Sequence, residues 1–90
     1  MIEIQGTVIG KVQGVQFRDY VQSVAGELGI VGYVQNNHDG SVLVVGQAEP
    51  DTLKSFVEYL HEGSVLSEVN SVSVEWGTAR VTYDDFSVLQ

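Results

Sequence analysis

The chain has 90 residues, enough for one domain with a modest core and too few for a second, so we expect residues 1–90 to form a single domain. It contains no cysteine, which excludes a disulfide framework and a thiolate nucleophile. Twelve acidic against four basic residues give a formal net charge of −8, which argues against binding to nucleic acid or to an anionic membrane. The N-terminus has neither a basic segment nor a long apolar run, so we expect a cytoplasmic protein without a signal peptide or a membrane span.

The first two predicted elements are a strand over residues 2–10 and a helix over about residues 18–28. The strand is indicated by loose alternation of apolar side chains at Ile2, Ile4 and Val8. The helix is indicated by an apolar stripe at i, i+3, i+4 and i+7, made by Val21, Val24, Ala25 and Leu28. Gly29 is the residue type that commonly ends a helix.

Two further predicted strands, Gly32 to His38 and Ser41 to Ala48, flank the dipeptide Asp39-Gly40. This dipeptide favours a type I′ hairpin turn, in which both central residues have positive φ. We therefore expect the two strands to be antiparallel neighbours.

A second helix is predicted from Pro50 to about Gly63, with an apolar stripe made by Leu53, Phe56, Val57 and Leu60. A half-buried strand follows, in which Val72, Val74 and Trp76 alternate with Ser71, Ser73 and Glu75. Phe56 and Trp76 are interpreted as core residues because both lie on apolar stripes. The segment Phe86-Ser87-Val88 is predicted to add a short edge strand.

The resulting order is β-α-β-β-α-β with one possible extra strand. Two split βαβ units with right-handed crossovers place both helices on one face of the sheet. The predicted fold class is therefore α+β, a ferredoxin-like sandwich with a four- to five-stranded antiparallel sheet and two helices on one face.

The segment between the first strand and the first helix, Gly10 to Arg18, is a candidate anion site. Unpaired N–H groups at a helix N-terminus and the positive end of the helix dipole attract anions. Gly14 allows the backbone to approach a ligand closely, and Arg18 offers a planar fork that can bind two phosphate oxygens. The alternative is an ordinary surface turn with a solvated Arg18.

Other chemistry-bearing residues have simpler interpretations. His38 and Asp39 could suggest a metal pair, but they fall in the predicted hairpin turn and no further ligand follows at a suitable spacing. His61 lies near the end of the second helix and is interpreted as a surface residue. We expect no metal site and no cofactor.

Three segments together resemble the acylphosphatase signature: Gly10-Lys11-Val12-Gln13-Gly14-Val15-Gln16-Phe17-Arg18, then Gly32-Tyr33-Val34-Gln35-Asn36, then Asp39-Gly40. Asn36 lies eighteen residues after Arg18, and the resemblance extends over nearly the whole chain. The sequence departs from the family pattern at Gln16, where Gly, an aromatic or a small residue is usual, and at Gln35, where Arg or Lys is frequent.

The resemblance implies hydrolysis of acyl phosphates, which are carboxylic-phosphoric anhydrides, to a carboxylate and inorganic phosphate. It implies a small-molecule substrate, with inorganic phosphate as product and inhibitor, and a protein that acts as a monomer. Arg18 and Asn36 would be the catalytic residues, with Asn36 placing the attacking water. The phosphoryl group would be held by Gln13, Gly14, Val15, Gln16, Phe17 and Arg18.

Two other function classes remain open from the sequence. A non-catalytic module of the same fold could bind a phosphate or an acyl phosphate without turnover, and the combination of Arg18 with Asn36 argues for hydrolysis instead. An RNA-binding sheet of the ferredoxin-like class would need exposed aromatics and a basic surface, and the net charge of −8 argues against it.

Overall fold

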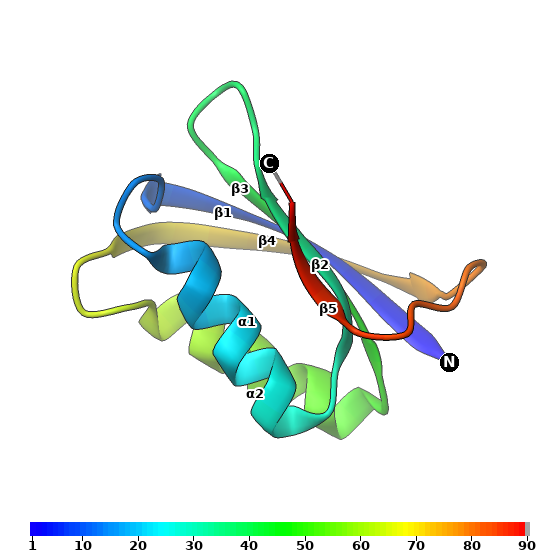
Figure 1. Ribbon diagram of the computed structural model, residues 1–90. Helices are drawn as coiled ribbons and strands as arrows, with labels where there is room; N and C mark the ends of the chain where they lie inside the picture. The colour runs from blue at the N-terminus through cyan, green and yellow to red at the C-terminus, as the bar shows by residue number, and fades with distance from the viewer. Residues whose placement is uncertain (90) are drawn as a thin grey trace.

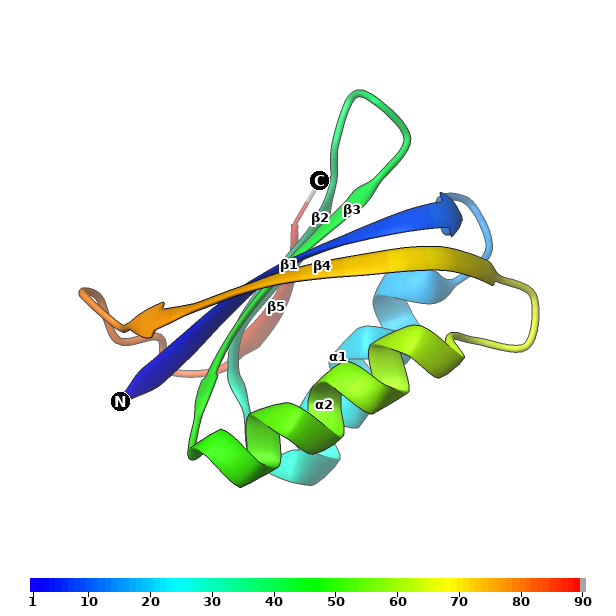
Figure 2. The ribbon, with the colours of Figure 1, turned by 180° about the vertical axis from the view of Figure 1, so that it is seen from behind.

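The computed structural model describes residues 1–89, which form five strands and two helices in the predicted order. In chain order they are β1 (Ile2–Lys11), α1 (Phe17–Leu28), β2 (Val31–Asn36), β3 (Val42–Ala48), α2 (Pro50–Glu62), β4 (Glu68–Thr78) and β5 (Phe86–Leu89). Both helices cover the same face of the sheet, as Figures 1 and 2 show from opposite sides. The predicted two-layer α+β architecture is confirmed.

The strands form one sheet in the order β4-β1-β3-β2-β5, with β1 paired antiparallel to both β3 and β4. β2 is antiparallel to β3, as predicted. The prediction of an entirely antiparallel sheet is wrong, because β5 runs parallel to β2.

The connection between β4 and β5 explains the parallel pairing. It crosses the end of the sheet from one edge to the other, so β5 starts beside Gly32 at the beginning of β2 (Figure 1). The buried side chain of Gln47 fastens this crossing segment: its amide nitrogen donates to the carbonyl oxygen of Val81, and its amide oxygen accepts from the backbone N–H of Tyr83. Such a crossing connection has no local sequence signature.

The core lies between the sheet and the helices. The α1 stripe contributes Val21, Val24 and Ala25, and the α2 stripe contributes Leu53, Phe56 and Leu60. Neither helix within residues 1–89 combines the length and apolarity needed to cross a membrane. The assignment of Trp76 to the core is wrong: it lies opposite Ile4 on the helix-covered face, but it belongs to the edge strand β4 and keeps 48% of its surface exposed.

The β2–β3 connection differs from the predicted type I′ turn. β2 ends at Asn36 and β3 begins at Val42, and within this connection only Gly40 has a positive φ. The carboxylate of Asp39 accepts hydrogen bonds from the hydroxyl of Ser41 at 2.6 Å and from its backbone N–H at 3.0 Å, which stabilises a longer turn. These bonds lower the pKa of Asp39.

Replacing Gly32 by alanine tests the close pairing of β2 with β3. Gly32 has φ +144°, and a Cβ atom there would collide with the carbonyl oxygen of Val45. We expect Gly32→Ala to lower the free energy of unfolding by at least about 2 kcal/mol in urea denaturation. The matched control is Gly77→Ala, where a Cβ atom meets nothing within 4 Å and the change should be within about 0.5 kcal/mol. Equal effects of the two substitutions would contradict this account.

Candidate active site

The β1–α1 loop, residues 12–16, is fixed at both ends by the core. Val12 at its start and Phe17 just after it each keep only 1% of their surface exposed. Between these anchors the chain makes two left-handed turns, at Gly14 with φ 71° and at Gln16 with φ 60°. Left-handed residues alternating with ordinary ones orient successive backbone N–H groups into a concave surface that suits an anion.

The N-terminus of α1 continues this set of donors. The first backbone N–H of the helix to bond within it is that of Tyr20, which donates to the carbonyl oxygen of Gln16 at 3.1 Å. The N–H groups of Phe17, Arg18 and Asp19 therefore have no partner within the helix. The Gln16 side chain makes no capping hydrogen bond. A negatively charged group placed here would meet several N–H donors and the positive end of the helix dipole.

Arg18 extends from the first turn of α1 over the same region. Its guanidinium Nη1 donates to the carbonyl oxygen of Leu89 at 2.8 Å, at the end of β5. Arg18 lines a hollow of about 270 Å³ together with Gly14, Gln16 and Asp19. This contact uses one nitrogen of the guanidinium, so the rest of its fork is available to a ligand.

Asn36 is the last residue of β2. Asn36 lies two residues after the fully buried Val34, so both side chains are on the helix-covered face of the sheet, with Asn36 at the end of the strand. Its amide oxygen Oδ1 is buried and has no hydrogen-bond partner among residues 1–89. A buried acceptor without a partner costs free energy, and its presence marks a place where a bound molecule could donate a hydrogen bond.

Two long-range contacts bring the β1–α1 loop, Arg18 and Asn36 to the same end of β2. The carbonyl that receives Arg18 belongs to Leu89, which pairs with Gln35, the residue before Asn36. The side-chain amide of Gln13 donates to the carbonyl oxygen of Asn37, the residue after Asn36, at 2.8 Å. The structure thus joins the segments around Asn36 to both ends of the loop region.

The Gln13 side chain is a tether within the protein. Besides its bond to Asn37, it donates to the carbonyl oxygen of Ser41 at 2.9 Å. The amide of Asn37 in turn donates to the hydroxyl of Ser41 at 2.9 Å, which connects the tether to Asp39. Of the predicted phosphate ligands, Gln13 therefore has only its backbone N–H available for an anion.

The remaining candidates are dispersed. His38 lies exposed in the β2–β3 connection and His61 lies exposed near the end of α2. Over the described range 1–89, no group of three or more His, Asp or Glu side chains lies close enough to hold a metal ion. Sequence reasoning missed the roles of Leu89 and Gln13, because a backbone acceptor and a side-chain tether leave no signal in residue type or spacing.

Gln13→Ala tests the tether between the loop and the β2–β3 connection. It removes two partly buried hydrogen bonds, each worth about 0.5–1.5 kcal/mol net, so we expect the free energy of unfolding to fall by about 1–3 kcal/mol. Hydrogen exchange of the loop amides should also become faster. Gln5→Ala, at an exposed position in β1, is the control and should change stability by less than about 0.5 kcal/mol. Equal stability and equal loop exchange in Gln13→Ala and Gln5→Ala would show that the tether does not matter.

Comparison with known proteins agrees with the fold and with the family resemblance of the sequence. The acylphosphatase family model matches residues 4–88. An acylphosphatase of Dehalococcoides mccartyi strain CBDB1 is 40% identical over an alignment of 86 residues, with 94% of this chain and 94% of that one covered. The crystal structure of acylphosphatase from Bacillus subtilis covers all of both chains with a TM-score of 0.96 and 34% identity. An acylphosphatase structure from Coxiella burnetii has a TM-score of 0.91 and 39% identity, covering 97% of this chain and 90% of that one. The chain belongs to the acylphosphatase family.

Proposed function

We propose that this acyl phosphate hydrolase holds the phosphoryl group of its substrate against the β1–α1 loop with Arg18 and directs a water molecule at phosphorus with Asn36. The observation that supports this most is the buried Oδ1 of Asn36 at the end of β2, which has no partner within residues 1–89 and whose neighbouring residues are joined to the loop and to Arg18. The products are a carboxylate and inorganic phosphate.

The phosphoryl group is bound by positioned donors. The backbone N–H groups of residues 13–18 surround the phosphoryl oxygens, and the Arg18 guanidinium neutralises part of the charge on these oxygens. Gln13 takes part through its backbone N–H alone. Phosphoryl transfer asks for little covalent chemistry from a protein: equatorial oxygens must be stabilised and the nucleophile must be held in line. The hydrogen bond to the carbonyl oxygen of Leu89 restrains the guanidinium and so supports this role.

Asn36 positions the nucleophile and does not remove its proton. An amide side chain is no base, but its Oδ1 accepts a hydrogen bond from water and so directs a lone pair of the water oxygen at phosphorus. The new P–O bond forms as the bond from phosphorus to the acyl oxygen breaks. The proton released by the water passes to a phosphoryl oxygen of the substrate.

The leaving group requires no general acid. A carboxylic acid has a pKa near about 4 on the side-chain reference scale, so the carboxylate departs with the bonding electron pair and remains unprotonated near neutral pH. The proposed machinery therefore consists of a guanidinium, backbone amides and one side-chain amide. It uses no metal ion and no cofactor.

The proposal includes a cytoplasmic, monomeric enzyme that acts on a small molecule. The net charge of −8 supports the absence of nucleic-acid and membrane partners, since both are polyanionic.

One experiment distinguishes the proposed hydrolase from the rival function, a module that binds phosphate without turnover. The protein is incubated with acetyl phosphate, and acetate release is followed by NMR against the spontaneous rate. Binding with no release above that rate would favour the module.

Arg18→Ala is expected to lower kcat/KM for acetyl phosphate by at least about 100-fold, or about 2.7 kcal/mol, because up to two charge-assisted hydrogen bonds to the phosphoryl group are lost. Arg80→Ala removes an exposed arginine outside the site and serves as the control for the change in net charge. Circular dichroism and thermal unfolding verify that both variants fold. A folded Arg18→Ala enzyme with full activity would remove Arg18 from the mechanism.

Asn36→Ala is expected to lower kcat strongly while the inhibition constant of inorganic phosphate changes by less than about threefold, because the proposed partner of Asn36 is water. Stability should be nearly unchanged, since the substitution deletes a buried oxygen that has no partner among residues 1–89. Asn70→Ala, on the exposed part of β4, is the control. Parallel losses of kcat and of phosphate affinity would instead make Asn36 a phosphate ligand.

A further inference from the structure

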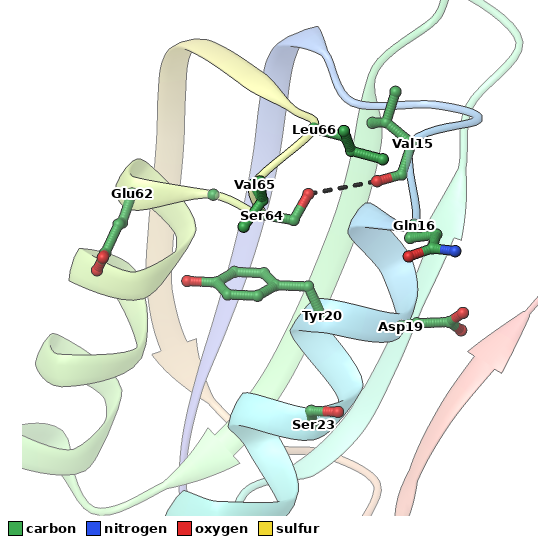
Figure 3. A pocket seen from close by; sticks show the side chains of 10 residues that line it. Val15, Gln16, Asp19, Tyr20, Ser23, Glu62, Ser64, Val65 and Leu66 are labelled. Carbon is green, nitrogen blue, oxygen red and sulfur yellow. Dashed lines mark hydrogen bonds between the residues drawn. The ribbon is translucent and has the colours of Figure 1, made fainter.

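A cleft of about 440 Å³ lies directly beside the β1–α1 loop, between α1 and the connection from α2 to β4. Val15 and Gln16 form its border with the loop, and Tyr20 forms its floor on the α1 side (Figure 3). Its volume falls within the range of about 300–1,000 Å³ that is usual for small-molecule sites. No step of the mechanism above uses it.

The cleft adjoins the place proposed for the phosphoryl group. Gln16 and Asp19 line both the cleft and the hollow that Arg18 lines. The hydroxyl of Ser64 donates to the carbonyl oxygen of Val15 at 3.3 Å, so the far wall of the cleft is bonded to the loop itself (Figure 3). A molecule with its phosphate on the loop could therefore extend into the cleft without leaving the protein surface.

The direction of the cleft suits the leaving group. In an in-line displacement, the attacking and leaving oxygens lie on opposite sides of phosphorus. Asn36 approaches from β2, on the side of the sheet where α1 packs against β2 and β5. The cleft opens toward α2, which packs against β4, β3 and β1. Water directed by Asn36 would thus expel the carboxylate toward the cleft.

The walls of the cleft combine apolar surface with negative charge. Val65 and Leu66 are adjacent in the chain and expose 99% and 61% of their surface, so they give the cleft an apolar wall. Glu62 and Asp19 are the charged residues of its lining, and within the described residues no Lys, Arg or His lines it. The pKa of the Tyr20 hydroxyl at the cleft floor is raised, first by burial, then by the negative charge of Glu62 and then by Tyr59. Glu62 therefore affects the electrostatics of the cleft.

We infer that the acyl group of the substrate lies in this cleft, and that Leu66 and Glu62 make the enzyme prefer uncharged, apolar acyl groups over acyl groups that carry a carboxylate. Leu66 covers an apolar acyl group and removes part of its surface from water. Glu62 repels a second negative charge on the substrate. This inference rests on the proposed function, because it requires the phosphoryl group to occupy the loop.

The test compares three probes that share a phosphoryl group and differ in the acyl group: acetyl phosphate, benzoyl phosphate and succinyl phosphate. The variants are Glu62→Lys and its matched control Glu27→Lys. Both positions are exposed near helix C-termini, and both substitutions change the net charge equally, so only the local field at the cleft differs. Glu62→Lys should raise kcat/KM for succinyl phosphate, relative to acetyl phosphate, by about 3- to 10-fold, and Glu27→Lys by less than about twofold.

A second pair of variants tests the apolar wall. Leu66→Ser should lower kcat/KM for benzoyl phosphate, relative to acetyl phosphate, by about 3- to 10-fold. Val81→Ser is the matched control, because Val81 exposes 64% of its surface in the β4–β5 connection, and its ratio should stay constant. Leu66 and Val81 are both exposed, and thermal unfolding checks that the two variants fold.

The outcomes separate this inference from the proposed function. If the wild-type protein hydrolyses acetyl phosphate but the substrate ratios of Glu62→Lys and Leu66→Ser match those of their controls, the cleft does not hold the acyl group and the inference fails alone. If the wild-type protein hydrolyses none of the three probes, the proposed function fails and the inference fails with it.

Discussion

The burial of Val12 and Phe17 in the common core is the constraint on which the candidate site depends. A short loop of exposed residues would ordinarily sample many conformations, and its N–H groups would point in many directions. Here both ends are held by side chains that are 1% exposed, and the residues between them adopt two left-handed turns. Packing of the hydrophobic core, the most rigid part of a small domain, therefore fixes the orientation of the proposed phosphate donors.

The proposed arrangement of donors would also allow an acidic protein to bind an anionic substrate. The net charge of −8 repels anions at long range, but this repulsion is screened beyond a Debye length of about 8 Å at physiological ionic strength. At contact distance a phosphoryl group would meet Arg18 and the amides of the loop. In that arrangement the overall charge would affect the rate of encounter, whereas the local donors would determine the affinity.

Most of the fold could be predicted because its helices and strands follow from local patterns of apolar residues in the sequence. The apolar stripes around Val21 and Leu53 predict both helices to within about one residue, and alternation predicts the strands.

Features that depend on the course of the whole chain could not be predicted. Alternation gives a strand no direction, so it does not reveal that β5 is parallel to β2. It assigns Trp76 to a face of the sheet but does not show that an edge strand leaves this side chain exposed. The bond from Arg18 to Leu89 joins residues 71 positions apart and involves a backbone atom, so no side-chain type indicates it. The cleft beside the β1–α1 loop likewise arises from two connections that meet only in three dimensions.

The attachment of Arg18 to β5 gives the candidate site a thermal limit of its own. β5 has four residues, lies at the edge of the sheet and pairs with β2 alone. Short edge strands open with a smaller free energy than the whole domain requires to unfold, and such local openings occur many times for each global one. Each opening would release the guanidinium from the carbonyl of Leu89 while β1, β3 and the helices stay folded. On heating, the bond that holds Arg18 is therefore lost by fraying at one margin of the sheet, at temperatures where most of the protein, with the loop between Val12 and Phe17, is still native.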